Sequence, residues 1–222
     1  MLLPKPSRLR GIQTYSEELG LDLRRPRDRF KWFLASMLFA KRISSTAAKN
    51  TFRKFSEEGL ITPDAIMAAG WDKLVKVLDS GGYVRYDFST ATNLLSVSDS
   101  LLKRYGGLES LHRKAKSPEH LEEMLMDFKG VGPVAANIFL RELRGIWEKA
   151  NPAPSPLALR VARRLRLRKV DQFESQLVRL ELEFCRKGKC DVCPVAEMCS
   201  DGRDQKPRGS CARASKRSSR MS

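Results

Sequence analysis

The sequence predicts an all-α protein. Apolar side chains recur at three- and four-residue spacing along most of its 222 residues, which is the periodicity of amphipathic helices. These segments often begin at Ser or Thr, which are favoured helix caps, and end at Gly. No segment alternates apolar and polar residues convincingly, so we expect roughly ten helices and no β-strand.

The first predicted helices follow directly from these signals. Residues 29–44 are strongly apolar and predict a buried helix. Ser44 or Ser45 is the expected cap of the next helix, which Gly59 ends. Both helices contain enough apolar residues to contribute to a core.

Proline after a cap marks three of the later helices. Thr62, Ser117 and Ser155 each precede a proline, whose fixed φ suits the first helical position. Glycine pairs at 81–82 and 106–107 end two others. The later helices are therefore expected at 62–70, 71–82, 85–107, 117–128, 133–149, 156–166 and 171–185.

The chain is strongly basic. Lys and Arg number 42 against 26 Asp and Glu, which gives a formal net charge of +16. Such an excess indicates a polyanionic partner, with nucleic acid as the first candidate. The alternative is a charge-rich surface of the thermophile type, although that usually adds acidic residues as well. Residues 201–222 carry seven Lys or Arg and two Asp with almost nothing apolar, and we expect a disordered basic tail there.

The sequence gives no sign of a membrane or an export signal. No apolar run approaches the roughly 20 residues that span a bilayer. Proline interrupts the first residues too early for a secretory signal. We therefore expect a monomeric cytoplasmic protein, associated with the nucleoid if it is prokaryotic. In that reducing compartment, five cysteines indicate metal binding or buried thiols rather than disulfides.

Four of the five cysteines lie within fifteen residues, and we expect them to be metal ligands: Cys185, Cys190, Cys193 and Cys199. Their successive gaps contain four, two and five residues. Thiolates are soft ligands, and four together suit either a [4Fe-4S] cluster or zinc. The spacing alone does not separate these two. Cys211, in the basic tail, is expected to be a bystander.

A second motif lies between two predicted helices, where Gly130 and Gly132 flank Val131. Glycine has no Cβ, so the backbone of such a turn can approach a phosphate closely. The free N–H groups at the start of the following helix form an anion site at the positive end of its dipole. We expect all three residues to contact DNA through their backbone, with the Val131 side chain in the core and Lys129 on a phosphate. An ordinary glycine turn is the alternative.

These motifs together resemble the endonuclease III branch of the helix-hairpin-helix (HhH-GPD) DNA glycosylases. The resemblance spans about residues 30–200. It rests on FLASMLFAKRISSTAAKNTF, DSGGYVRYDFSTA, FKGVGPVAANIFL, PSPLALRVARRL and the cysteine loop. The family has two helical lobes with DNA between them and a [4Fe-4S] cluster in the cysteine loop. The first cysteine gap is usually six residues in the family and is four here, so zinc stays as the alternative.

The resemblance implies a division of the chain into four parts. Residues 1–28 are expected to contribute to the lobe that holds the cluster. Residues 29–145 form a helical lobe that contains the helix-hairpin-helix at 118–144. Residues 146–200 form the second lobe with the cysteine loop at 185–199, and the tail follows at 201–222.

The two catalytic groups of the family are both missing. The lysine that attacks C1′ in bifunctional members falls on Val134, which cannot be a nucleophile. The aspartate that stabilises the cationic sugar falls near Ser155. No aspartate occurs anywhere between residues 128 and 170, so a shifted alignment does not restore one.

Other carboxylates and amines in the same region could replace the two missing groups. Glu148 and Asp127 are the candidate catalytic carboxylates, and Glu142 is more simply a surface charge on its helix. Lys129 and Lys149 are candidate amines, although phosphate contacts suit both better.

Other family positions keep suitable residues. Lys41 falls where the family places the side chain that fills the gap left by a flipped base, or else it is the charged end of a buried helix. Tyr83 is expected to stack on a flipped base and Arg85 to contact the base or a phosphate. The alternatives are a core tyrosine and a solvated arginine. Trp147 and Tyr86 are expected in the core.

The sequence thus favours an enzyme that binds damaged or mismatched duplex DNA and excises a base by hydrolysis, without efficient strand cleavage at the abasic site. A non-catalytic DNA-binding relative of the glycosylases is the alternative. A zinc-containing interaction module is a third, less favoured class.

Overall fold

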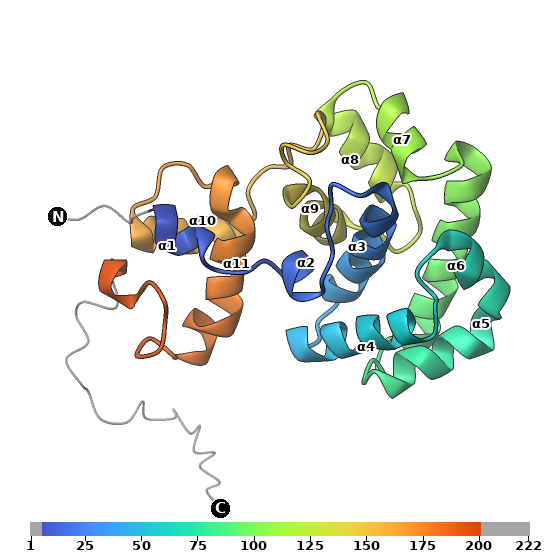
Figure 1. Cartoon of the computed structure of the whole chain (residues 1–222), viewed down its shortest axis with the longest axis horizontal. Helices are drawn as coiled ribbons and strands as arrows, with labels where there is room; N and C mark the ends of the chain where they lie inside the picture. The colour runs from blue at the N-terminus through green and yellow to red at the C-terminus, as the bar shows by residue number, and fades with distance from the viewer. Residues whose placement is uncertain (1–5, 201–222) are drawn as a thin grey trace, which may run out of the picture.

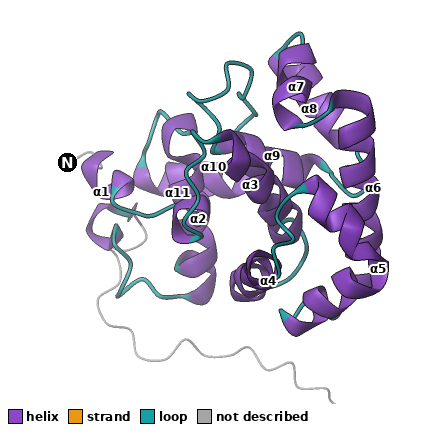
Figure 2. Cartoon of the chain, turned by 45° about the vertical axis from the view of Figure 1, so that its right-hand side comes forward, coloured by secondary structure: helices purple, strands orange, loops and turns teal. Residues whose placement is uncertain are grey.

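The computed structural model describes residues 6–200, and these are helical apart from turns and loops (Figures 1 and 2). The predicted basic tail and Cys211 lie outside the described residues. The α-helices are α1 (Pro6–Arg10), α2 (Tyr15–Glu18), α3 (Pro26–Phe39), α4 (Ser45–Glu57), α5 (Pro63–Ser80), α6 (Asp87–Tyr105), α7 (Leu108–Lys114), α8 (Pro118–Met126), α9 (Pro133–Arg141), α10 (Pro156–Leu165) and α11 (Glu174–Glu183). Short 3₁₀ turns, η1 (Asp171–Phe173), η2 (Cys185–Lys187) and η3 (Ala196–Met198), complete the list.

The predicted caps are confirmed. The hydroxyls of the four Ser and Thr caps each accept a hydrogen bond from the amide three residues later, at Ser44, Thr62, Ser117 and Ser155. Each bond satisfies one of the amides that a helix start leaves free. Gly106 ends α6 in the left-handed conformation, with φ of 73°.

Several helix boundaries differ from the prediction: α3 ends at Phe39 and not at residue 44, and α7 was not predicted. The helices expected at 62–70 and 71–82 form one element, α5, which is interrupted only by Gly70 with φ of 72°. The helix expected to reach residue 149 is wrong, since α9 ends at Arg141. Beyond it the amides of Leu143 and Ile146 donate to carbonyls three residues back, and Gly145 turns the chain with φ of 76°.

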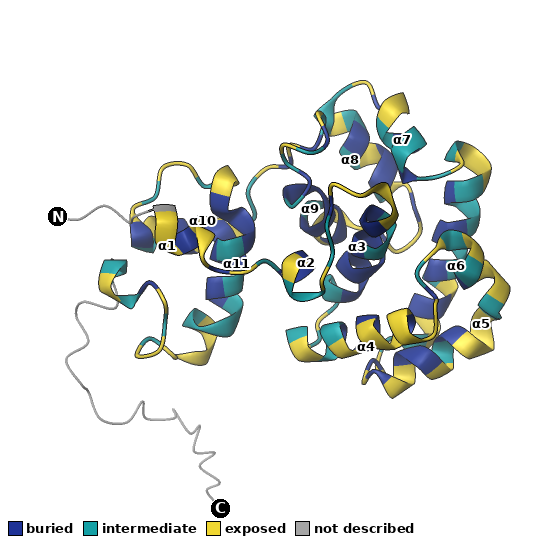
Figure 3. Cartoon of the chain, in the orientation of Figure 1, coloured by how far each residue is buried: buried dark blue, intermediate teal, exposed yellow. Residues whose placement is uncertain are grey.

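The buried apolar side chains form two separate cores (Figure 3). The larger one is built from α3 to α9 and extends to Trp147 and Ala150, past the expected boundary at residue 145. The smaller one joins α10 and α11 to Leu9 and Ile12 of the N-terminal segment. In Figure 1 the helices of this smaller lobe, α1, α10 and α11, lie to the left of the others.

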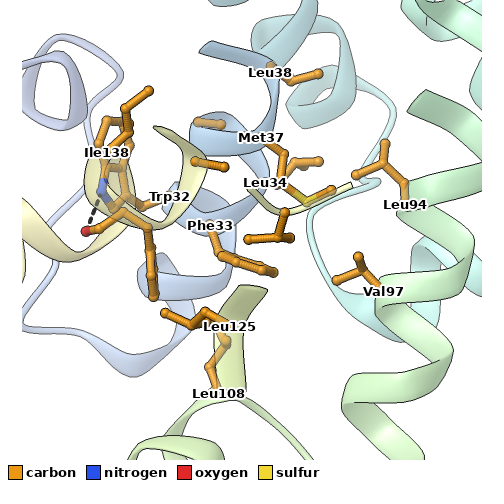
Figure 4. Close-up of a cluster of buried hydrophobic side chains, with 14 of the residues drawn as sticks. Trp32, Phe33, Leu34, Met37, Leu38, Leu94, Val97, Leu108, Leu125 and Ile138 are labelled. Carbon is orange, nitrogen blue, oxygen red and sulfur yellow. Dashed lines mark hydrogen bonds between the residues drawn. The ribbon is translucent and has the colours of Figure 1, made fainter. Parts of the chain in front are cut away.

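Helix α3 is the centre of the larger lobe, and its side chains point toward several other helices (Figure 4). The Trp32 indole donates a hydrogen bond from Nε1 to the Phe139 carbonyl of α9, at 3.2 Å. The Phe33 ring meets Phe128 and Phe139 edge-on. Burial of an aromatic side chain of this size contributes about 2–3 kcal/mol, so these contacts fix α9 and the turn before it onto α3.

A polar network connects the two lobes. Glu183 of α11 accepts hydrogen bonds from the Tyr15 hydroxyl at 2.9 Å and the Ser45 hydroxyl at 2.7 Å, and it pairs with Lys187 at 2.7 Å. Burial alone would raise the pKa of Glu183. The hydrogen bonds from Lys187, Ser45 and Tyr15 outweigh it and lower that pKa to about 2. We call these four residues the interlobe network.

The interlobe network predicts a pH-dependent loss of stability in Glu183→Gln. Hydrogen bonds to a charged group contribute about 1.5–3 kcal/mol, so the free energy of unfolding should fall by about that amount at neutral pH in urea titrations. Because the folded-state pKa is depressed, the wild-type advantage should be complete above the ordinary value of 4.5 and should vanish as the pH falls toward 2. A difference that stays constant across this range would show that the charge of Glu183 is not what joins the lobes.

Candidate nucleic-acid interface and catalytic cleft

The turn between α8 and α9 has a buried back and a bare front. The Val131 side chain is 4% exposed and packs in the larger core, as predicted. The Val131 amide closes the turn by donating to the Phe128 carbonyl at 3.0 Å. The expectation that this amide contacts DNA is therefore wrong, because the turn itself uses the donor. Lys129, Gly130 and Gly132 are exposed on the other side.

The two glycines of the turn have different physical roles. Gly130 has φ of 87°, a conformation that disfavours any side chain, and a Cβ there would lie 2.8 Å from the Cβ of Asn93 in α6. Gly132 has ordinary extended backbone, and a Cβ there would meet nothing within 4 Å. Gly130 is thus required by the fold, whereas the absence of a side chain at Gly132 leaves the surface open.

The first turn of α9 presents free backbone donors. Pro133 occupies the first helical position and has no N–H. Within the described part of the chain, no acceptor takes the amides of Gly132, Val134 or Ala135, while the Ala136 amide makes the first helical bond to the Gly132 carbonyl at 3.0 Å. These donors lie at the positive end of a nine-residue helix, an arrangement that suits a phosphate.

A cleft of about 970 Å³ opens beside this turn, between the two lobes. Its walls come from the end of α3, the start of α4, the first turns of α9, the loop 152–157 and the end of α11. Val134 and Ser155, the positions on or near which the catalytic groups of the family are predicted to fall, line this cleft together with Lys41. Val134 is 60% exposed, although it is apolar.

Ser155 is held in place by Glu174, which does not itself line the cleft. The Glu174 side chain is 1% exposed and accepts a hydrogen bond from the Ser155 amide at 2.8 Å. It also accepts one from the Asn137 side chain of α9 at 3.0 Å and pairs with Arg144 at 2.7 Å. The carboxylate therefore ties the loop 152–157 of one wall to α9 in the other.

The charges that line the cleft are mainly positive. Five basic side chains contribute to its walls: Lys41, Arg42, Arg141, Arg186 and Lys187. Among the described residues of its lining, Glu122 of α8 is the one carboxylate. Sequence reasoning missed Glu122, because on the helical pattern of α8 it reads as one more surface charge. The sequence signal for Glu122 was its place on α8, the helix that leads into the hairpin, four residues before Met126.

The carboxylates predicted to be catalytic lie elsewhere. Asp127 forms an ion pair with Arg104 at 2.6 Å and does not belong to the lining of the cleft. Glu148 is exposed in the turns after α9 and also lies outside that lining. Neither of the two predicted carboxylates therefore lines the cleft beside the hairpin.

Glu142 is not the surface charge that was expected. Both oxygens of its carboxylate are buried, and burial raises the pKa of Glu142 although Arg141 opposes this. The group faces a second cavity, of about 760 Å³, which Thr14, Ser16 and Ser175 also line. It therefore lies outside the cleft.

The turn after α5 also differs from its prediction in part. Tyr83 is fully buried, and its hydroxyl donates to the Leu38 carbonyl at 3.0 Å. The ring packs in the core and is not offered to a flipped base, so that prediction is corrected. Arg85 is exposed, with its guanidinium 5.6 Å from the Tyr86 ring centre. Trp147 is buried in the larger core, as expected. Tyr86 is partly buried and packs against that core.

The four cysteines lie in the loop that follows α11. Three of them, Cys185, Cys193 and Cys199, pack against the smaller core. Burial raises the pKa of the Cys193 thiol, and the neighbouring Cys199 and Cys190 thiols raise it further. Within residues 6–200, no three Cys, His, Asp or Glu side chains are close enough to hold a metal ion as they stand. The donor set itself, four partly buried thiols in one short loop, is of the chemical type that holds a soft metal centre.

Comparison with known proteins identifies the fold. The sequence matches no family model and no curated protein. The structure matches a solved complex of endonuclease III with DNA, a trapped covalent intermediate with an estranged adenine, at a TM-score of 0.52 and 16% identity. The match covers 91% of this chain and 98% of that one. The chain therefore has the all-α endonuclease III fold of the helix-hairpin-helix glycosylases, as predicted, and identity at this level establishes the fold alone.

The structure also bears on the membrane. No helix within residues 6–200 is long and apolar enough to span one.

The two glycines of the turn predict separable effects of an added methyl group. Gly130→Ala should lower both stability, by about 1–3 kcal/mol, and DNA affinity, because it strains the backbone and displaces Asn93. Gly132→Ala should cost less than about 1 kcal/mol of stability but should still weaken DNA binding, because the methyl group covers the free amides. Urea unfolding and fluorescence anisotropy with a labelled duplex measure the two quantities. Unchanged DNA affinity in Gly132→Ala would remove the turn from the interface.

Proposed function

We propose that this protein is a DNA-repair glycosylase of the monofunctional type. It binds duplex DNA along the basic face of the hairpin and takes a damaged or mismatched base out of the helix into the cleft. There it hydrolyses the N-glycosidic bond and leaves an intact abasic strand. The observation that carries this proposal is the cleft itself, which joins free helix-start amides, five cations and a space of about 970 Å³.

The hairpin supplies the sequence-independent part of DNA binding. The free amides of Gly132, Val134 and Ala135 hold a phosphate, and the exposed Lys129 adds a cation beside them. Lys41 lies across the cleft from α9, at the end of α3, where it is placed to enter the duplex as a base leaves. Arg85 reaches a phosphate or base from the neighbouring turn.

The absence of strand cleavage follows from Val134. An apolar side chain occupies the start of α9 at the mouth of the cleft, where a lysine would attack C1′. Water is then the nucleophile, and the reaction ends at the abasic sugar. A non-catalytic DNA-binding relative is the second candidate, and the observation that favours it is the loss of both family groups, at Val134 and Ser155.

A panel of duplexes, each with one lesion, tests the activity. The lesions are uracil, hypoxanthine, an oxidised purine, an oxidised pyrimidine, an alkylated base and an abasic site. We expect at least one strand to break only after heating in alkali, and no covalent complex with abasic DNA after borohydride. Binding without any break would favour the non-catalytic candidate, and efficient borohydride trapping would contradict the role of water.

Val134→Lys tests the position of the missing nucleophile in the same assays. Because the side chain is exposed, the change should alter stability by less than about 0.5 kcal/mol. We expect the variant to form a borohydride-trapped complex with abasic DNA. Met67→Lys, an exposed site on α5 outside the cleft, adds the same charge and should trap nothing.

We also propose that Cys185, Cys190, Cys193 and Cys199 hold a [4Fe-4S] cluster, with zinc as the alternative. The family resemblance and the soft donor set support this assignment. The cluster would draw the loop 185–199 together against the smaller core and fix its basic residues next to the cleft. Arg186 and Lys187, which line the cleft, lie within that loop.

The cluster proposal predicts a brown protein that contains iron and acid-labile sulfide in equal amounts. Cys193→Ser should lose most of the iron and several kcal/mol of stability, since the change removes one of the four proposed ligands and a side chain that packs against the smaller core. Metal analysis, the visible spectrum and urea unfolding report these effects without any assay of activity. A colourless protein with one zinc per chain would establish the alternative.

A further inference from the structure

We propose that Glu122 is the catalytic carboxylate of the cleft and takes the role that the family assigns to the missing aspartate. This inference rests on the proposed function. Glu122 lies on α8, the helix that enters the hairpin, and it lines the same cleft as Val134 and Ser155. Glu122 reaches the cleft from α8, whereas the aspartate of the family aligns near Ser155. An alignment around Ser155 therefore does not reveal Glu122.

The Glu122 carboxylate is not occupied by a structural contact. No hydrogen bond or ion pair within residues 6–200 engages its carboxylate. Three other carboxylates discussed above are committed: Asp127 to Arg104, Glu183 to the interlobe network, and Glu174 to Ser155 and Arg144. Arg144 acts on Glu122 only at longer range, because its guanidinium already binds Glu174 and the carbonyls of Pro152 and Asp171.

The position of Glu122 relative to the anion site supports the same role. Helices α8 and α9 pack against each other on either side of the turn. Glu122 precedes the end of α8 by one helical turn, and its side chain lines the same cleft as Pro133 and Val134 at the start of α9. A nucleotide whose phosphate rests on the free amides of α9 would extend its sugar into this cleft, toward Glu122.

The local polarity supports this role too. Burial raises the pKa of Glu122, and the charge of Glu119 raises it further, while Arg144 opposes both. A carboxylate of raised pKa is a better proton acceptor than one in open water. Lys41 and Arg42, which have no carboxylate partner within residues 6–200, attract the DNA backbone, and Glu122 provides the negative charge that a cationic sugar requires.

The step assigned to Glu122 is hydrolysis at C1′. The bond between C1′ and the base nitrogen breaks, and its electron pair leaves with the base, which takes up a proton from solvent. The carboxylate stabilises the positive charge that develops on the sugar. Water adds its oxygen to C1′ and gives a proton to Glu122, which passes it on to solvent. The products are a free base and an abasic strand, with no change of oxidation state.

A pair of abasic-site analogues tests the role of Glu122 without knowledge of the lesion. One duplex carries a pyrrolidine, which is cationic at the position of the developing charge, and the other carries a neutral tetrahydrofuran. Anisotropy titrations should show that the full-length wild-type protein prefers the cationic analogue by about tenfold or more, which corresponds to ~1.4 kcal/mol. Glu122→Gln should lose this preference and keep its affinity for the neutral analogue, which also shows that it folds.

The matched control is Glu123→Gln, because Glu123 is the exposed neighbour on α8 and does not line the cleft. It should keep the wild-type preference. On the lesion that the wild type excises, Glu122→Gln should be slower by roughly 100-fold or more, and Glu123→Gln should not.

The outcomes separate the two proposals. A preference for the cationic analogue that persists in Glu122→Gln, or that is absent from the wild type, overturns the role of Glu122. Excision that survives in Glu122→Gln also overturns it and leaves the glycosylase intact. A wild-type protein that excises no lesion overturns the glycosylase itself.

Discussion

The contact of Phe33 with Phe128 and Phe139 is the interaction on which the site depends. The ring centres lie 6.4 and 5.1 Å apart, and both pairs meet edge-on. Phe128 opens the turn between α8 and α9, and Phe139 lies on α9, so a single side chain of α3 fixes both ends of the hairpin from behind. Val131 completes this buried back. The front of the turn then carries the exposed Lys129 and the two glycines, and the amides of Gly132, Val134 and Ala135 have no acceptor within residues 6–200.

The second constraint is the separation of the two cores. Each lobe buries its own apolar residues, and polar contacts cross between the lobes. The interlobe network at Glu183 and the bonds of Glu174 join the walls from opposite ends. Both carboxylates are held by donors from other elements, which leaves Glu122 to act on a substrate. Structural and catalytic carboxylates are therefore distinguished by their partners and not by their position in the sequence.

Much of the fold could be predicted because its signals are local. Caps at Ser44, Thr62, Ser117 and Ser155 depend on residues within one turn, and the glycines of the hairpin act through their own backbone. Other features depend on contacts between distant elements. The buried Tyr83 hydroxyl is bonded to the carbonyl of Leu38, 45 residues earlier, and the Asp127 carboxylate forms an ion pair with Arg104. Nothing in the residues around these positions reports such partners.

The candidate site was predicted in part for the same reason. Gly130, Gly132 and Lys129 are exposed on the turn and Lys41 lines the cleft, positions that agree with the roles predicted from their sequence context. The Val131 amide was misassigned because its acceptor is created by the turn itself. Glu122 was overlooked because the cleft that it faces exists only once the lobes are assembled. Helix α9 ends at Arg141 because the chain continues in turns up to Ala150. Gly145, within these turns, has positive φ.

The central claim is that duplex DNA binds across the hairpin and the cleft beside it. Amide hydrogen exchange, with and without a duplex that carries a tetrahydrofuran abasic site, tests this claim most directly. The amides of Gly132, Val134 and Ala135 have no acceptor in the described structure, so they should exchange quickly in the free protein. The account predicts that DNA slows these amides and those of residues 40–46. Slowing confined to another face, such as the exposed Trp71 and Phe88 on α5 and α6, with the hairpin unchanged, would contradict it.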